Sequence, residues 1–120
     1  MVSFKLKSRH WIVDEFDRII IGEGRKEILE NIEKTGSINQ TAKRMRMSYK
    51  GVWSKIKATE KYLDKPIVHA DRKSGTSLTE EGKELLKKYG VLKERCLKED
   101  NDIFDRVFGQ EGRVIGGKPK

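Results

Sequence analysis

The hydrophobic pattern of the chain starts as a strand pattern and becomes helical near residue 25. Apolar and polar residues alternate in part over residues 4–13, at Phe4 and Leu6 among others, and three isoleucines follow at 19–21. Alternation and short apolar runs are typical of strands, so we expect two strands around a turn over Asp14–Asp17. Apolar residues then recur at helical spacing and stop at a glycine, which predicts a first helix from about Arg25 to Lys34.

Two further helical patterns follow with only two residues between them. Asn39 is suited to cap a helix through Met45, and Ser48 to cap a helix through about Leu63. Helices joined so tightly must cross steeply, which indicates a helix-turn-helix. The side chains expected on their shared inner side are Ile38, Met45, Val52, Ile56 and Leu63.

The helix that begins after Ser48 is the expected recognition helix, the one that would enter a groove of DNA. An α-helix fits the major groove of DNA, where polar and cationic side chains near its N-terminus reach base edges and phosphates. Free backbone amides beside Ser48 also suit a phosphate oxygen. The groove candidates are Tyr49, Lys50, Ser54 and Lys57, the phosphate candidates are Lys43, Arg44, Lys55, Arg72 and Lys73, and Gln40 and Thr41 are expected near the DNA backbone. Trp53 is a further candidate, although packing against the following hairpin is the simpler explanation for it.

The stretch "IVHADRKSGTSLT" predicts a small hairpin after the recognition helix. A hairpin in this position is a wing, whose tip can contact the DNA backbone or the minor groove. The side chains expected at or near the tip are Arg72, Lys73, Ser74 and Thr76. A plain surface hairpin is the alternative.

Thr79, followed by two glutamates, starts a last long helix. Apolar residues then recur at spacings of four, three and four, a seam of coiled-coil type, at Leu85, Tyr89, Leu92 and Cys96. We expect this seam to form a homodimer interface; packing onto the chain's own N-terminal strands is the alternative. Residues 109–120 are Gly-rich and basic and are expected to form a flexible tail.

The charge of the chain is concentrated in its middle. The net charge is +8 over 120 residues. Between Lys43 and Lys73 there are ten lysines and arginines against three carboxylates, so this segment holds seven of the eight excess charges. Such a surplus favours a polyanion such as nucleic acid, while a solvated face is the alternative.

Other chemistry finds little support in the sequence. The single cysteine excludes an intramolecular disulfide, and the two histidines lie far apart, so we expect no metal site and no cofactor. No phosphate loop, nucleophile elbow or dinucleotide motif occurs, and we expect no enzyme activity. Without a signal-peptide pattern or an apolar span, the expected location is the cytoplasm, with no membrane association.

The segments "TGSINQTAK", "MSYKGVWSKI" and "LTEEGKELL" together resemble the N-terminal winged-helix domain of the ModE family of molybdate-responsive regulators, which is related to the LysR-type DNA-binding domain. The resemblance covers about Gly22 to Tyr89. It implies a dimer whose helix from Ser48 reads operator half-sites, with the N-terminal strands and the last helix at the dimer interface.

Three departures from that family limit what the resemblance implies. Arg46 stands in the turn where the family usually has glycine, and the wing tip "DRKSGTS" is short. Only about thirty residues follow Tyr89, so the molybdate-binding domains have no counterpart and this chain is not expected to sense molybdate by itself. A separate effector-sensing partner is left open.

The expected fold is mainly α with small β (α+β): a winged helix-turn-helix with an N-terminal β-hairpin and a long C-terminal dimerisation helix over residues 1–108. The expected function is a sequence-specific regulator of transcription that binds double-stranded DNA as a homodimer. The alternatives are a winged-helix module whose basic side binds an acidic protein or a membrane surface, and a nonspecific nucleoid-type DNA-binding protein.

Overall fold

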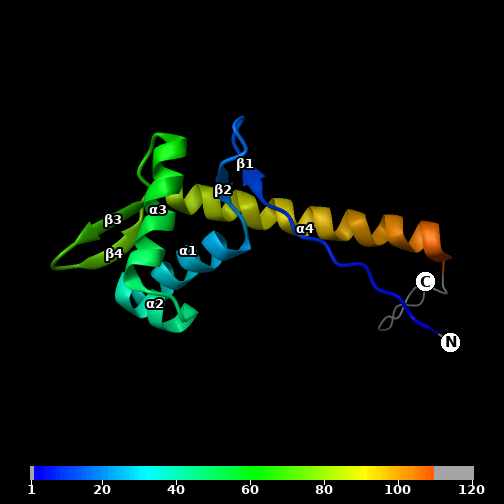
Figure 1. Cartoon of the computed structure of the whole chain (residues 1–120), viewed down its shortest axis with the longest axis horizontal. Helices are drawn as coiled ribbons and strands as arrows, with labels where there is room; N and C mark the ends of the chain where they lie inside the picture. Colours follow the sequence, from blue (N-terminus) through cyan, green and yellow to red (C-terminus); the bar gives the residue numbers. More distant parts are fainter. Residues whose placement is uncertain (1, 110–120) are drawn as a thin grey trace. The chain divides into compact units, whose positions relative to one another are not determined.

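The computed structural model describes residues 2–109, in which two strands, three helices, two strands and a long helix follow one another (Figure 1). The chain divides into two compact units, one formed by His10–Gly90 and the other by residues 2–9 together with 91–109. The tail expected at residues 109–120 lies outside the described residues apart from Gly109. The expected domain boundary after residue 108 therefore stays a prediction.

The first unit begins with the expected hairpin. Strands β1 (Ile12–Val13) and β2 (Ile19–Ile21) pair antiparallel. The side chain of Asp14 closes the tip, because its Oδ1 accepts two backbone N–H groups of the turn at 2.9 and 3.0 Å. The strand pattern at Phe4 and Leu6 was misleading, since both residues lie outside any strand.

Helix α1 (Glu23–Thr35) ends where the sequence predicts, at Gly36, which takes the left-handed conformation with φ 67°. Helix α2 (Ile38–Met45) starts two residues earlier than expected. Its cap is Ser37, whose hydroxyl accepts the backbone N–H of the third helical residue at 3.0 Å, so the assignment of the cap to Asn39 was wrong. A serine directly after a helix-ending glycine satisfies both helix ends within two residues.

The remaining elements follow the predicted order. Helix α3 (Tyr49–Leu63) leads into the antiparallel hairpin of β3 (Val68–Asp71) and β4 (Gly75–Leu78). Helix α4 (Glu80–Phe108) directly follows Thr79, whose hydroxyl accepts a backbone N–H of the first turn at 3.0 Å. These bounds confirm the winged helix-turn-helix.

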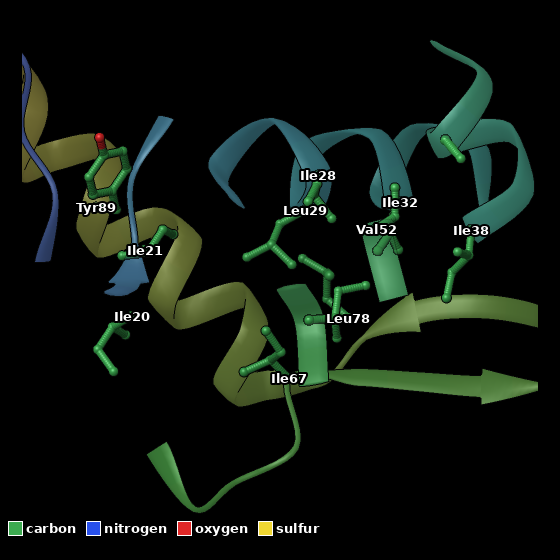
Figure 2. Close-up of a cluster of buried hydrophobic side chains, with 12 residues drawn as sticks. Ile20, Ile21, Ile28, Leu29, Ile32, Ile38, Val52, Ile67, Leu78 and Tyr89 are labelled. Atoms are coloured by element: carbon green, nitrogen blue, oxygen red, sulfur yellow. The ribbon is translucent and has the colours of Figure 1, made fainter. Parts of the chain in front are cut away.

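One hydrophobic core holds the elements of the His10–Gly90 unit together (Figure 2). Its buried side chains are Ile20, Ile21, Ile28, Leu29, Ile32, Ile38, Ala42, Val52, Ile56, Ile67, Leu78 and Tyr89. A buried hydrogen bond adds a polar link, because the Thr59 hydroxyl on α3 donates to the Ile20 carbonyl oxygen on β2 at 2.7 Å. Burial of each large aliphatic side chain contributes about 1.5–3 kcal/mol to the stability of the fold, so this core stabilises the helices that carry the candidate site.

Candidate nucleic-acid interface

A short turn, Arg46–Ser48, sets the angle between α2 and α3. Arg46 ends α2 in the left-handed conformation with φ 56° and ψ 43°. The next N–H, that of Met47, donates to the carbonyl oxygen of Ala42 at 2.9 Å and completes the helix end. The turn therefore has the shape for which glycine is the usual residue, and Arg46 adopts it in spite of its side chain.

Ser48 then starts α3 as the sequence predicts. Its hydroxyl accepts the backbone N–H of Gly51 at 2.9 Å, while the side chain itself stays exposed. A Cβ on Gly51 would lie 3.1 Å from the Ser48 hydroxyl oxygen, so a glycine here gives the cap room. The positive end of the helix dipole consequently faces solvent, which suits an anion such as a phosphate group.

Polar and cationic side chains cover the first turns of α3. Tyr49, Lys50, Ser54 and Lys55 are all exposed. The Ser54 hydroxyl donates to the Gly51 carbonyl oxygen at 3.0 Å, which leaves its lone pairs to accept from a ligand. This surface offers a helix N-terminus with exposed donors and acceptors, the arrangement that reads base edges in the major groove.

Lys57, one turn further along α3, is engaged within the protein. Its Nζ lies 3.0 Å from Glu60 Oε1 and 4.6 Å from the centroid of the Trp53 ring. The Trp53 side chain is half-buried and packs against the hydrophobic core. Trp53 is therefore less accessible to a ligand than the exposed side chains of the first turn, whereas Lys57 is exposed and its ammonium group already has Glu60 as a partner.

Exposed cations also lie outside α3. Lys43 and Arg44 are exposed on the last turn of α2, beside the exposed Gln40. Within residues 2–109, no carboxylate forms an ion pair with either cation or with Lys50 or Lys55. The positive charge that the sequence concentrates in this segment is therefore available to a polyanion.

The wing tip is a short turn of three exposed residues, Arg72, Lys73 and Ser74. The backbone N–H of Lys73, 2.8 Å from Asp71 Oδ1, and then the Ser74 hydroxyl lower the pKa of the Asp71 carboxyl below its ordinary value. Asp71 is thus ionised at neutral pH and orders the tip through the backbone. Thr76, also expected near the tip, is half-buried at the second position of β4.

The structure overturns one proposed DNA contact. Thr41 has an exposed fraction of 0%, and its hydroxyl lies 3.4 Å from the hydroxyl of Thr35 inside the protein. A polar residue near the start of α2 was taken to face outward, but this helix turns that position toward α1. Thr41 therefore cannot touch DNA through its side chain.

The proposed dimer seam on α4 is also corrected in its first half. Tyr89 has an exposed fraction of 0% and its hydroxyl donates to the His10 carbonyl oxygen at 2.6 Å, with Glu23 Oε2 at 3.3 Å. Burial, and then the Glu23 carboxylate, raise the pKa of Tyr89 to about 12. Leu85 packs partly against the same core. Tyr89 therefore packs within its own subunit and is not available to a dimer interface.

The second half of the seam differs. Leu92 is 41% exposed and Cys96 is half-buried, in the unit formed by residues 2–9 and 91–109. Ile103 and Val107 are exposed in the same unit, at 48% and 70%. Spacings of four, seven and four place these four residues on one side of the helix.

Sequence reasoning passed over Glu60. Its Oε2 accepts the backbone N–H groups of Ile67 and Val68, at the start of the wing. The signal in the sequence was its position three residues after Lys57, a spacing that pairs charges on a helix. Nothing in the sequence indicated the contact with the wing.

Comparison with known proteins assigns the domain. Residues 25–83, which include α2, the turn and α3, match the family described as bacterial regulatory helix-turn-helix protein, lysR family. This segment is a lysR-family helix-turn-helix domain.

The relatives of this chain include one protein named a transcriptional regulator and one named a molybdenum transport protein. The chain is 33% identical over 78 residues to the transcriptional regulator ModE of Haemophilus influenzae, covering 62% of this chain and 31% of that protein. It is 31% identical over 101 residues to the molybdenum transport protein ModE of Azotobacter vinelandii, covering 81% of this chain and 36% of that protein. The chain thus spans about a third of the length of these relatives.

A solved structure shares the fold of the lysR-type domain. Full-length CbnR complexed with its target DNA superposes with a TM-score of 0.56 at 17% identity, over 68% of this chain and 28% of that one. Within residues 2–109, no group of three or more His, Cys, Asp or Glu side chains is placed to hold a metal ion. No helix in that part of the chain is long and apolar enough to cross a membrane.

Proposed function

We propose that this protein is a regulator of transcription that binds a specific sequence of double-stranded DNA. The observation that carries the proposal is the exposed start of α3, where Ser48, Tyr49, Lys50 and Ser54 face solvent on a lysR-type domain. Base recognition is assigned to Lys50, Tyr49 and Ser54. Phosphate contacts are assigned to Lys43, Arg44, Lys55, Arg72 and Lys73, with Gln40 nearby and Ser48, Ser74 and Thr76 as hydrogen-bonding groups.

The active form in this proposal is a homodimer. The exposed apolar residues Leu92, Ile103 and Val107 of α4 support it, because a second copy of the same helix would remove them from water. A two-fold dimer would read two half-sites about 34 Å or more apart, one turn of the DNA helix. We infer further that the protein works in the cytoplasm, requires no cofactor for binding and is not an enzyme.

The decisive experiment is selection of bound duplexes from random DNA, followed by titration of the selected and a scrambled duplex at several salt concentrations. A specific regulator should prefer the selected duplex by about a thousandfold or more, and its affinity should fall steeply as salt rises. A ratio near one would instead identify a nonspecific nucleoid-type protein. Absence of duplex binding at low salt, with a stable complex with an acidic protein, would replace the proposal by an interaction module.

A further inference from the structure

The carboxylate of Glu60 joins α3 to the wing. Its Oε2 accepts the backbone N–H of Ile67 at 2.9 Å and that of Val68 at 3.2 Å, while Oε1 accepts from Lys57 Nζ at 3.0 Å. The Glu60 side chain is only 12% exposed. Hydrogen bonds to a carboxylate are stronger than those between neutral groups, and partial burial protects them from competition by water.

The backbone of Ile67 is also held by residues at the start of α4. The Ile67 carbonyl oxygen accepts the backbone N–H of Thr79 at 3.0 Å, just before α4. Gly82, in the first turn of α4, comes so close that an added Cβ would lie 2.1 Å from that same oxygen. Both backbone polar groups of Ile67 are therefore fixed, one by α3 and the other by the start of α4. The wing leaves the domain from this residue.

The other carboxylate oxygen is fixed by the outer side of α3. Lys57 binds Oε1 of Glu60 and at the same time lies over the Trp53 ring, 4.6 Å from its centroid. Trp53, Lys57 and Glu60 thus form a chain of contacts along α3 that ends at the first wing strand. This chain limits the rotamers of Glu60, so that Oε2 stays directed at the two wing amides.

We infer that Glu60 is a positioning residue that holds the wing in a fixed register with α3, so that the wing tip and the start of α3 meet one DNA duplex together. The inference rests on the proposed function, which it deepens. Glu60 touches no DNA in this arrangement; it acts through the backbone of Ile67 and Val68. Glu60 has two opposite effects on DNA binding. Its negative charge repels phosphate and weakens binding, whereas its hold on the wing favours binding, so the two effects can be measured separately.

The test uses two substitutions at Glu60 and matched controls at Glu33, an exposed glutamate on α1. In Glu60→Ala the wing amides lose their acceptor. In Glu60→Gln the amide oxygen can still accept from them, and the charge changes as it does in Glu60→Ala. Hydrogen exchange of the Ile67 and Val68 amides is measured without DNA, with the Val52 amide of α3 as the internal reference for global opening. Affinity for the selected duplex is measured in parallel.

We expect Glu60→Ala to speed exchange of both wing amides about tenfold or more relative to Val52. It should also weaken duplex binding about tenfold, although removal of a negative charge would by itself strengthen the attraction to phosphate. Glu60→Gln should lie between the wild type and Glu60→Ala in both measurements, since it keeps an acceptor for the wing amides but loses the charge and the bond to Lys57. Glu33→Ala and Glu33→Gln should not weaken binding, because they change only the charge.

Unchanged exchange of Ile67 and Val68 in Glu60→Ala would overturn the inference, because the contact would then not hold the strand. Equal duplex affinity of Glu60→Ala and Glu60→Gln would overturn it too, since the contact would then have no bearing on DNA. If the wild type itself bound no duplex at low salt, the proposed function would fail and the positioning role with it. Amide exchange would still decide separately whether Glu60 fixes the wing.

Discussion

The backbone N–H of Thr76 donates a 2.9 Å hydrogen bond to the carbonyl oxygen of Gly36. Thr76 lies on β4 of the wing and Gly36 between α1 and α2, so this bond ties the wing to the helix-turn-helix at a second point besides Glu60. The approach is close because the neighbouring residue of the wing is Gly75, where a Cβ would lie 2.7 Å from the Gly36 oxygen. Glycine is needed there for space and for its φ of 88°.

Gly75→Ala should therefore destabilise the protein. The new Cβ meets backbone rather than a flexible side chain, and the left-handed φ adds strain, so we expect a loss of about 1–3 kcal/mol in the free energy of unfolding. Urea denaturation followed by circular dichroism measures it. Ser77→Ala, at an exposed position of the same strand, is the control and should change the stability by less than about 0.5 kcal/mol. Equal stability of the two variants would refute the close approach.

Arg46→Gly should stabilise the protein. A non-glycine residue in the left-handed region costs about 1–2 kcal/mol, and the greater freedom of glycine in the unfolded chain takes back about half of that. We expect a net gain of about 0.5–1 kcal/mol in the free energy of unfolding, measured in urea without DNA.

Lys43→Gly is the matched control for the turn. It removes one positive charge from the same helix, but Lys43 has ordinary helical conformation, so glycine should destabilise this variant by about 1 kcal/mol. The two substitutions thus differ in sign. A loss of stability in both variants would show that Arg46 is not strained.

Lys50→Ala and Lys55→Ala separate base reading from phosphate attraction on one helix. Both lysines are exposed, and each variant loses one charge. We expect Lys50→Ala to reduce the discrimination between selected and scrambled duplexes by about 1–3 kcal/mol. Lys55→Ala should weaken both duplexes equally and reduce the slope of log affinity against log salt by about one. An equal loss on both duplexes for Lys50→Ala would reassign it to phosphate.

Tyr89 makes the stability of the domain sensitive to alkaline pH. Its pKa is raised to about 12 in the folded protein, against an ordinary value of 10.0. A raised folded-state pKa means that the neutral phenol stabilises the fold fully below pH 10 and that this contribution is lost as the pH rises toward 12. Over that window the wild type should lose about 2–3 kcal/mol that Tyr89→Phe does not lose.

Comparison of the wild type with Tyr89→Phe removes the effect of lysines, which titrate in both proteins. At pH 7 the wild type should be more stable by about 1 kcal/mol, because the phenol bonds the His10 carbonyl oxygen at 2.6 Å. Near pH 12 the order should reverse. A difference that stays constant from pH 8 to pH 12, measured by urea denaturation, would rule out the raised pKa.

Local signals explain why most of the fold could be predicted from the sequence. Ser48, Gly36 and Thr79 each end or begin a helix through their own backbone or side chain, so their effect depends on a few neighbouring residues. The short turn at Arg46 likewise follows from the two helix patterns on either side. The exposed residues at the start of α3 could be named from the sequence because the Ser48 cap fixes where this helix begins.

Burial of particular side chains depends on contacts far along the chain and could not be predicted in the same way. Tyr89 recurs at the same helical spacing whether it packs on its own subunit or on a second copy, and only the approach of His10, 79 residues away, decides between them. Thr41 is polar and was expected outside, yet the fold buries it beside Thr35. The contact of Glu60 with Ile67 depends on where the wing starts relative to α3.

The proposed homodimer can be tested with two neighbouring residues of equal exposure. Leu92 is 41% exposed and Val91 44%, but consecutive residues point about 100° apart around a helix. Leu92 shares its side of α4 with Ile103 and Val107, whereas Val91 does not.

Leu92→Asp should convert the dimer to a monomer at micromolar concentration, because a charge placed in an apolar helix interface loses its hydration. Val91→Asp should leave the dimer intact. Light scattering gives the two masses, and circular dichroism checks that both variants keep their helices. A dimer that survives Leu92→Asp, or a wild type that is monomeric, would remove this side of α4 from the interface. Dissociation by both variants would instead show that the interface extends around the helix.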